Sequence, residues 1–524
     1  MRLYGDAARL VAILSCLLVI FGVACRFLDL GDKFYWVDEV NTSIHAVGKT
    51  KPEIAVLLQA EAGRTLTLGF LRDLIERPDP AGSFGDTVTA LVRDDPHHPP
   101  LYYLIARAWI AAEGGAPVSL RLLSALLSLL AVPAVYWLGR EAFGGPLPGV
   151  ICAGLFAISP FHLIYAQQVR EDGLWTALVA ASTAALLRAQ RRDSRLDLGC
   201  YALLSILSLY TSLLSLPVLA CQFCYGAWHH HDTPRRFWPL GLSVALAGLA
   251  FLPWLWIVLS QLHRIADMNS GSAEPISPAL YAQTLFLNLS RPFFDIDQPS
   301  YQALPFQEPA SMLILVLIPA IEIIAMAMFL GNRTRAGNLP RIMLAGAGLL
   351  GAIALDLTTG GRHALIPRYA LPSWLAFQVM IAGFLSRGLG AGRPMRRWAA
   401  CLCFLFLAVC GITSTATYLP RPLWWTSRPP ILARAVVQAQ LLDVDMVIAW
   451  PELDGVGLLS LAESLPRETK LLFLDGSGRI AASLPASLLL YDPSDAVKQS
   501  LGERYVLEEL VPSSYLWIAR ARPG

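Results

Sequence analysis

Charge is scarce in this sequence. Only 15% of its 524 residues are charged, 55% are hydrophobic, and the mean hydropathy is +0.51. A soluble protein of this size cannot cover its surface with so few charged residues, so much of the apolar surface must face lipid. The composition excludes an ordinary soluble protein and favours an integral membrane protein.

The sequence also lacks a basic face and a disulfide framework. Its net charge is +2, and the arginines fall in short clusters between apolar runs, which argues against nucleic acid as a partner. All nine cysteines lie inside apolar runs, and none lies in the long polar segments where an oxidising compartment would form disulfides. Neither disulfides nor a zinc site is indicated.

Long apolar runs are what the sequence has instead. A bilayer core about 30 Å thick needs roughly 20 apolar residues per helix, and about eleven runs qualify. Residues 9–28 are long enough to span, so we interpret them as a retained first helix rather than a signal peptide. The weakest pair, 198–211 and 212–228, could also be one long kinked helix. The runs are 9–28, 118–138, 149–166, 173–188, 198–211, 212–228, 238–258, 311–330, 339–357, 371–386 and 398–417.

Positive charges predict the orientation. Arginines concentrate in alternate short loops, and such loops face the cytoplasm. The N-terminus is then inside, and long outer segments occupy 29–117, 259–310 and 418–524. The run Leu101–Ala112 is too short to cross and is expected to lie as a helix along the outer surface or to dip into it.

The last hundred residues change character. Short β-rich runs alternate with turn residues, and a helix is expected near 431–442. We predict two domains: an all-α polytopic membrane domain over 1–417, and a small extracytoplasmic α/β domain over 418–524. The predicted strands are Met446–Trp450, Lys470–Leu474, Ser487–Tyr491 and Tyr515–Ala519.

Two adjacent carboxylates, Asp38 and Glu39, open the first outer loop after three aromatic residues. Aromatic rings at that depth are ordinary interfacial residues. An acidic pair at the rim of a membrane cavity can serve as a base or bind a cation. The loop ends with Asp94 and Asp95 in a stretch that its prolines suggest is flexible, followed by His97–Pro100, for which a rigid surface turn is the competing interpretation.

Two further outer turns carry arginines, against the positive-inside trend. Gln167, Gln168 and Arg170 form a dense polar group that could face a cavity or anchor a helix end at the interface. Arg368 precedes Tyr369 in the second turn. Arginine suits bidentate phosphate binding, so Arg170 and Arg368 are informative.

Together these segments resemble GT-C glycosyltransferases. Five motifs stand in the family's order over roughly residues 10–385. The nearest resemblance is to bacterial relatives of dolichyl-phosphate-mannose protein mannosyltransferases, a group that includes the aminoarabinose lipid A transferases. The chain departs from the common pattern at Gln168–Asp172 and at Thr211-Ser212. The motifs are Trp36 with Asp38 and Glu39, His98–Tyr103, Leu120–Ala125, Ser159–His162 with Gln167 and Arg170, and Arg368–Pro372.

The resemblance implies a GT-C fold and an enzyme of the bacterial cell membrane. Such an enzyme passes a hexosyl or pentosyl group from a polyprenyl-phosphate carrier to a glycan, lipid or protein acceptor on the outer side, with inversion at C1. The family's base corresponds to Asp38, with Glu39 as its neighbour. No cofactor is certain, and a divalent cation stays open. The residues expected to bind substrate are His98, Arg121, Tyr165, Gln167, Arg170, Arg368 and Tyr369.

The chemistry fits these residue types independently. Displacement at an anomeric carbon needs a base on the attacking hydroxyl and a stabilised leaving group, and Arg or His⁺ can hold a lipid phosphate. A transporter or lipid flippase is the main alternative, and it would need discontinuous helices at the bilayer midplane. A non-catalytic carbohydrate-binding relative is a third, against which the intact Asp38–Glu39 pair argues.

Other polar residues receive a structural interpretation. Glu322 and Asp356 lie in or near spans, where acids are functional candidates, but we favour structural pairing for both. His229–His231 looks like a metal site. It lies in a predicted cytoplasmic loop beside Arg235 and Arg236, so we interpret it as a solvated loop.

Overall fold

The computed structural model describes residues 5–229, 234–268, 276–296, 309–331, 349, 352–353, 356–357, 361–424, 430–450, 455–474 and 484–522. The chain divides into two compact units. The first unit contains Met1–Leu28, Pro96–Tyr102 and Ser124–Pro420, and the second contains Asp29–Asp95, Tyr103–Leu123 and Arg421–Gly524. This division differs from the predicted domains, because most of the outer loop 29–117 groups with the C-terminal segment.

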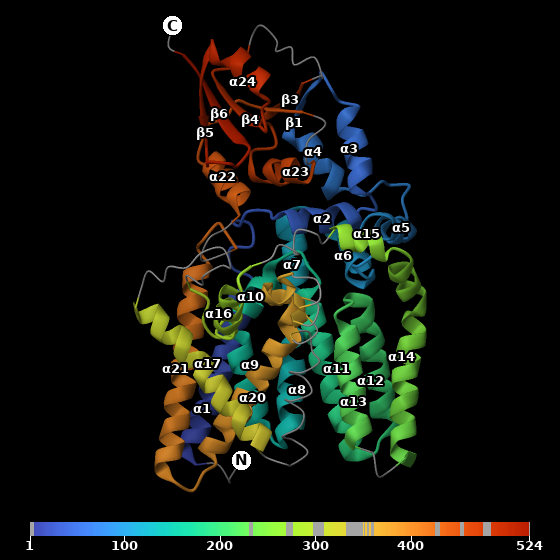
Figure 1. The fold of residues 1–524 in the computed structure, drawn as a ribbon, viewed down its shortest axis with the longest axis vertical. Coiled ribbons are helices and arrows are strands. Elements are labelled where there is room, and N and C mark those ends of the chain that lie inside the picture. The colour runs from blue at the N-terminus through green and yellow to red at the C-terminus, as the bar shows by residue number, and fades with distance from the viewer. Residues whose placement is uncertain are drawn as a thin grey trace. The chain divides into compact units, whose positions relative to one another are not determined.

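Helices form the first unit (Figure 1). Every predicted span carries a helix except 339–357, which lies mostly outside the described residues. The weak pair 198–228 forms two separate helices. The elements are α1 (Asp6–Cys25), α8 (Ala131–Phe143), α9 (Pro146–Ala157), α10 (Pro160–Gln167), α11 (Asp172–Arg192), α12 (Arg195–Thr211), α13 (Ser215–His229), α14 (Pro234–Ser260), α15 (Leu262–Met268), α16 (Pro278–Asn288), α17 (Pro309–Gly331), η2 (His363–Leu365), η3 (Pro367–Ala370), α20 (Leu371–Leu389) and α21 (Pro394–Tyr418).

Several of these helices suit a membrane. Among the described residues, five helical segments are long and apolar enough to cross a bilayer, or six if a bent pair counts as one span. The total of about eleven stays a prediction. The five are Asp6–Cys25, Pro117–Phe143, Phe237–Ser260, Pro367–Leu389 and Pro394–Tyr418.

The bent pair is α9 and α10, which together replace the straight span predicted at 149–166. The two helices meet at 62°. Pro160 begins α10 and has no N–H group to continue the ladder of α9, and Ser159 Oγ accepts from His162 N–H at 3.5 Å as a new helix start. The bend brings the polar end of α10 beside the start of α11.

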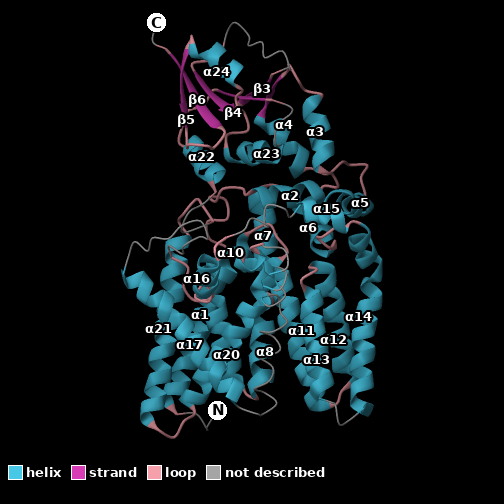
Figure 2. Cartoon of the chain, in the orientation of Figure 1, coloured by secondary structure: helices cyan, strands magenta, loops and turns pink. Residues whose placement is uncertain are grey.

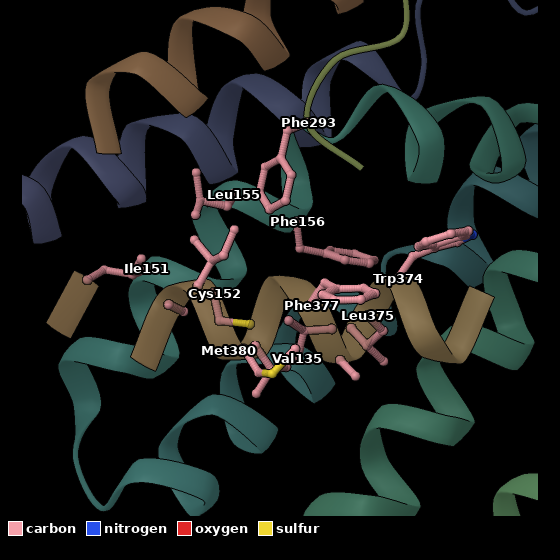
Figure 3. Close-up of a cluster of buried hydrophobic side chains, with 14 of the residues drawn as sticks. Val135, Ile151, Cys152, Leu155, Phe156, Phe293, Trp374, Leu375, Phe377 and Met380 are labelled. Carbon is pink, nitrogen blue, oxygen red and sulfur yellow. The ribbon is translucent and has the colours of Figure 1, made fainter. Parts of the chain in front are cut away.

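Close packing holds these helices together. A Cβ on Gly22 would come within 2.1 Å of Ala157 O, so α1 and α9 approach backbone to backbone. Figure 3 shows buried side chains of α8, α9 and α20 meeting in one cluster, including Phe156, Trp374 and Phe377. The rings of Trp374 and Phe377 stack with centroids 6.1 Å apart. This apolar packing fixes the helix ends that carry polar groups.

The second unit combines short helices with one sheet, and Figure 2 shows the strands gathered there. Two further helices, α6 (Leu101–Glu113) and α7 (Pro117–Ser128), contain residues of both units, and α6 matches the predicted helix at 101–112. The remaining elements are α2 (Val37–Ala46), α3 (Lys51–Gln59), β1 (Thr65–Thr67), α4 (Leu68–Glu76), α5 (Phe84–Asp94), α22 (Ile431–Gln440), β2 (Met446–Ala449), α23 (Gly455–Ser464), β3 (Lys470–Phe473), β4 (Ser487–Tyr491), α24 (Asp495–Gly502), β5 (Tyr505–Glu509) and β6 (Leu516–Ala521).

The sheet has six strands in the order β1-β3-β2-β4-β6-β5. Strand β2 runs parallel to β3 and β4, and the other pairs are antiparallel. The four predicted strands coincide with β2, β3, β4 and β6, whereas β5 and β1 were not predicted. Strand β1 comes from the first outer loop, where Thr65 pairs with Leu472. The C-terminal sheet is therefore completed by residues of that loop.

Candidate active site

The carboxylate pair lies on α2. Asp38 and Glu39 occupy its first turn, where the unpaired N–H groups of a helix favour negative side chains. Asp38 is half-buried, and its backbone carbonyl accepts from Thr42 Oγ1 at 3.0 Å. Glu39 has no exposed surface. The two neighbours therefore have different surroundings.

Arg121 on α7 holds the carboxylate of Glu39 from two sides. Its Nε donates to Oε1 at 2.9 Å and its Nη2 donates to Oε2 at 2.8 Å. Glu39 Oε2 also accepts from the N–H of Trp36 at 3.0 Å, which closes the first turn of α2. A planar guanidinium matches a carboxylate in this geometry. The pair fixes the start of α2, and with it the position of Asp38.

The remaining N–H groups of Arg121 bind the loop backbone. Nη1 donates to the carbonyls of Leu30 and Lys33, both at 2.9 Å, and Nη2 also donates to Phe34 O at 3.0 Å. With the two bonds to Glu39, all five N–H groups are accounted for within the described residues. Arg121 is only 1% exposed. Arg121 was predicted to bind substrate, and in the structure these N–H groups bond to Glu39 and the loop backbone.

The C-terminal segment contacts the same loop. Trp424 Nε1 donates to Phe34 O at 3.0 Å, and its ring centroid lies 5.0 Å from the Arg121 guanidinium and 5.6 Å from Lys33 Nζ. Lys33 Nζ donates to Arg421 O at 2.9 Å. Burial and the neighbouring Arg121 lower the pKa of Lys33 to about 7. The loop thus contains a lysine that titrates near neutral pH.

A buried acid on α23 lies in the same unit. Glu463 Oε2 is 3.5 Å from Arg72 Nε, and Ser460 on the same helix donates to the carbonyl of Tyr35. Burial and the neighbouring Glu76 raise the pKa of Glu463 to about 8, against the opposing effect of Arg72. Helix α23 therefore supports the loop that precedes the carboxylate pair.

Asp94 is not in a flexible stretch, as its prolines suggested, because α5 extends to that residue. Its Oδ2 accepts from Lys51 N–H at 3.0 Å and lies 2.8 Å from His45 Nε2. Burial alone would raise the pKa of Asp94, but these hydrogen bonds hold it below its usual range. Asp94 is bound to its neighbours and is a poor candidate for a base.

In the first unit, His98, Arg170 and Glu171 form a second polar cluster. His98 Nδ1 lies 3.0 Å from Glu171 Oε1, and Arg170 Nη2 lies 3.4 Å from His98 Nε2. These contacts fit a neutral imidazole that donates from Nδ1 and accepts at Nε2. Burial would raise the pKa of Glu171, but Arg170 and His98 hold it well below its usual range. The cluster joins the motif residues His98 and Arg170 to Glu171.

Tyr165, Arg368 and Tyr369 lie elsewhere in the first unit. Tyr165 is half-buried on α10, and its hydroxyl interacts electrostatically with Arg368 and Asp172. Arg368 lies in η3 with its guanidinium 5.6 Å from the ring centroid of Tyr369. Tyr165 and Arg368 are therefore neighbours that the sequence places about 200 residues apart.

Gln167 has a structural role in the described residues. Its Nε2 donates to the carbonyls of Cys25 and Leu28, at 3.1 and 2.9 Å, so it satisfies the free carbonyls at the end of α1. Its Oε1 accepts from Tyr418 Oη at 2.9 Å, which joins α10 to α21. Gln167 was expected to bind substrate, but its amide is bonded to protein on both sides.

Asp356 and Glu322, the two acids in or near predicted spans, differ in their hydrogen bonding. Asp356 is paired as expected: it accepts from Tyr281 Oη at 2.9 Å and lies 2.8 Å from His363 Nδ1. Glu322 on α17 is completely buried, and neither carboxylate oxygen has a hydrogen-bond partner in the described structure. Structural pairing is therefore confirmed for Asp356 and wrong for Glu322.

Comparison with known proteins supports the resemblance. Residues 97–257 match the family model of dolichyl-phosphate-mannose-protein mannosyltransferase. Over 298 residues the chain is 23% identical to the undecaprenyl phosphate-alpha-4-amino-4-deoxy-L-arabinose arabinosyl transferase of Edwardsiella ictaluri (strain 93-146), a match that covers 55% of this chain and 49% of that protein. The fold aligns with ArnT from Cupriavidus metallidurans bound to undecaprenyl phosphate, with a TM-score of 0.55, 14% identity, and coverage of 97% and 99% of the two chains.

These findings confirm the resemblance to the mannosyltransferase and aminoarabinose transferase group, and they show a GT-C fold. Together with the apolar helices, they make the chain a multi-pass membrane protein. The sequence match spans about half the length of the arabinosyl transferase.

Proposed function

We propose that this chain is a membrane glycosyltransferase that moves a hexosyl or pentosyl group from a polyprenyl-phosphate carrier to a hydroxyl acceptor. The acceptor is a glycan, lipid or protein on the extracytoplasmic side. The observation that carries the proposal is the buried Glu39–Arg121 pair, which fixes the first turn of α2 and presents Asp38 beside it, in a chain with a GT-C fold.

The proposed reaction is a single displacement at C1 of the sugar. The acceptor oxygen forms a bond to C1 while the bond from C1 to the phosphate oxygen breaks, so the configuration inverts. Asp38 accepts the hydroxyl proton as general base. The bonding electrons leave with the phosphate, which remains on the lipid as an anion. No carboxylic acid is needed for this leaving group, unlike in glycoside hydrolysis.

Cationic residues of the first unit are proposed to bind the carrier phosphate. Arg170 and Arg368 supply charge, and His98 supplies an imidazole that contacts Arg170 and Glu171. Tyr165 shares the electrostatic environment of Arg368. A divalent cation stays an open part of this proposal.

Glu39, Arg121 and Gln167 act as positioning residues in this proposal. Glu39 and Arg121 are buried and bonded to each other, and the Gln167 amide bonds to α1 and α21. Each holds a segment that carries a proposed functional residue, and none needs to touch the sugar.

The proposed topology places the N-terminus in the cytoplasm and residues 418–524 outside. The proposed catalytic part lies within residues 1–417, and it includes the outer loop that groups with the C-terminal segment in the second unit. A reporter enzyme fused after Gly524 tests this orientation. Activity only on the cytoplasmic side would contradict it.

The function is tested with purified protein and the lipid-linked sugars that accumulate in a deletion strain. We expect carrier phosphate to be released only when an acceptor is present, as measured by mass spectrometry. Appearance of the intact lipid-linked sugar in the opposite leaflet of proteoliposomes, without carrier release, would favour the flippase instead.

A further inference from the structure

One buried carboxylate binds the start of the turn that carries Arg368 and Tyr369. Asp356 precedes this turn in the first unit and is only 4% exposed. Its Oδ1 accepts from the backbone N–H of His363 at 2.6 Å and lies 2.8 Å from His363 Nδ1. Its Oδ2 accepts from the backbone N–H of Ala364 at 2.8 Å. Both oxygens of Asp356 therefore bind the first residues of η2.

Backbone hydrogen bonds continue from η2 to the turn of Arg368. The carbonyl of His363 accepts from the N–H of Ile366 at 3.1 Å, and the carbonyl of Ile366 accepts from the N–H of Tyr369 at 3.1 Å. Arg368 lies between these last two residues, in η3. Such short turns have few hydrogen bonds of their own, so outside contacts decide where they lie. A shift of His363 is therefore expected to move Arg368.

Helix α16 anchors both the carboxylate and the turn. Tyr281 Oη donates to Asp356 Oδ2 at 2.9 Å, and Asn288 Nδ2 donates to the carbonyl of Leu365 at 3.1 Å. Tyr281 and Asn288 are seven residues apart on this helix, so they lie on the same face. Asp356 thus accepts hydrogen bonds from α16 on one side and from η2 on the other, and it joins the two.

The position of the Arg368 backbone matters for anion binding. The Arg368 guanidinium lies 5.6 Å from the ring centroid of Tyr369 and interacts electrostatically with the hydroxyl of Tyr165 on α10. Ordering a long side chain when a ligand binds weakens the binding, and a backbone that is already fixed lowers this cost. The hydrogen bonds of Asp356 fix the turn in this way before any ligand arrives.

We propose that Asp356 is a positioning residue for Arg368: by binding the start of η2, it fixes the backbone from which the guanidinium reaches the carrier phosphate. This inference rests on the proposed function, which assigns Arg368 to that phosphate. Asp356 does not touch the carrier, and its effect passes through the turn. Structural pairing alone would stabilise the fold without changing how tightly the folded protein binds the carrier, so the two roles differ in a measurable way.

The test is the affinity of the purified full chain for undecaprenyl phosphate, measured in the parent, Asp356→Asn, Arg368→Gln and the double variant. An amide has one acceptor oxygen where the carboxylate has two, so Asp356→Asn leaves part of η2 unbound and should weaken binding about 10-fold. Arg368→Gln should weaken it by at least about 10-fold. In the Arg368→Gln background, Asp356→Asn should cost less than about twofold more, because no guanidinium remains to be positioned.

Two further variants separate positioning from stability. His363→Ala keeps the carboxylate and removes only the bond from the imidazole, so it carries the same test if Asp356→Asn does not fold. We expect about a threefold loss of affinity, which should again disappear in the Arg368→Gln background. Gln222→Leu is the control, since it removes the hydrogen bonds of another buried side chain, to Ser182 and Thr183, away from the turn. It should lower stability and leave affinity within about twofold of the parent.

The outcomes distinguish this proposal from the proposed function. Losses in Asp356→Asn and Arg368→Gln that multiply in the double variant overturn it, as does unchanged affinity in a folded Asp356→Asn variant. Both results leave the proposed function intact. Unchanged affinity in Arg368→Gln, or no carrier binding by the parent, overturns this proposal together with the assignment of Arg368 to the phosphate. Carrier binding without transfer in the parent would contradict the proposed function only, and the coupling of Asp356 to Arg368 would still be expected.

Discussion

Arg121 and Arg170 both belong to motifs that resemble those of GT-C glycosyltransferases, yet the groups that they bond to differ. Arg121 in the second unit bonds to a carboxylate and three backbone carbonyls at 2.8–3.0 Å. The contacts of Arg170 with His98 and Glu171 in the first unit are 3.4 and 3.5 Å long, and both partners are side chains. Short bonds to fixed acceptors suit an arginine that holds the fold. Longer contacts with side chains fit the proposed role of Arg170 in binding an anion.

Asp38→Asn should have the largest effect, because it removes the proposed base and leaves the Glu39–Arg121 pair intact. We expect turnover to fall about 10²–10⁴-fold while binding of the lipid donor is largely kept. The measurement is steady-state kinetics with the purified variant. Asp32→Asn, an exposed acid in the same loop, is the control. Near-parental turnover in the Asp38 variant would exclude Asp38 as the base.

Arg121→Ala tests whether Arg121 stabilises the fold. It leaves the Glu39 carboxylate buried without its partner, so we expect the free energy of unfolding to fall by about 3–5 kcal/mol. Chemical denaturation in detergent measures this loss.

The control is Arg64→Ala, which removes only an exposed ion pair and should change stability by less than about 1 kcal/mol. Arg121→Lys keeps the charge but loses the two-sided geometry, and it should lower turnover more than donor affinity. A stable Arg121→Ala variant with reduced donor affinity alone would instead make Arg121 a substrate contact.

Arg170→Gln tests whether Arg170 binds the carrier phosphate. Loss of a charge-assisted hydrogen bond to the carrier phosphate should weaken donor affinity about 10–100-fold, with a smaller effect on stability than Arg121→Ala. Titration with the lipid donor measures the affinity. Arg264→Gln is the control, because Arg264 is exposed on the predicted outer side. Arg291 is less suitable because it bonds to Asp295 at 2.8 Å. Unchanged donor affinity in Arg170→Gln would remove Arg170 from the site.

A further prediction concerns the pH dependence of stability, to which two buried groups of the second unit contribute in opposite directions. The pKa of Glu463 is raised to about 8, so its protonation stabilises the fold at low pH, and this contribution is lost as pH rises from about 4.5 to 8. The pKa of Lys33 is lowered to about 7, so the fold gains stability as pH rises from about 7 to 10.5.

Thermal unfolding in detergent should therefore show a minimum in stability near pH 7–8. Glu463→Gln should flatten the acidic side of this minimum and Lys33→Met the alkaline side. Identical pH profiles in the parent and both variants would show that neither group is perturbed by folding.

Sequence patterns predicted the parts of the fold that depend on local periodicity. Apolar runs matched helices such as α1 and α21, and β-rich runs matched β2 and β4. The bend between α9 and α10 was missed, although Ser159 and Pro160 are residues that end one helix and start another. Strand β1 was missed because three residues are too few to show the alternation of apolar and polar residues that marks a strand. Its partner also lies about 400 residues away.

The candidate site was predicted by residue type more than by role. Motifs identified Arg121 and Gln167, but their partners are mainly backbone carbonyls, which no sequence pattern displays. Lys33 and Trp424 were missed because each gains its environment from a distant segment. The sequence did indicate one pairing, because Glu171 directly follows Arg170. A buried acid beside a cation and a histidine, here His98, can be expected to pair with both.

The pairing of β1 with β3 also has a consequence for biosynthesis. The N-terminus of the chain emerges from the ribosome first. Thr65–Thr67 therefore emerges hundreds of residues earlier than the strand with which it must pair. Trp424 likewise arrives long after the carbonyl of Phe34 that it binds. The segment that carries Asp38 can therefore reach its final arrangement only when translation is nearly complete. A chain that stops before these partners are made would lack the contacts that hold this segment.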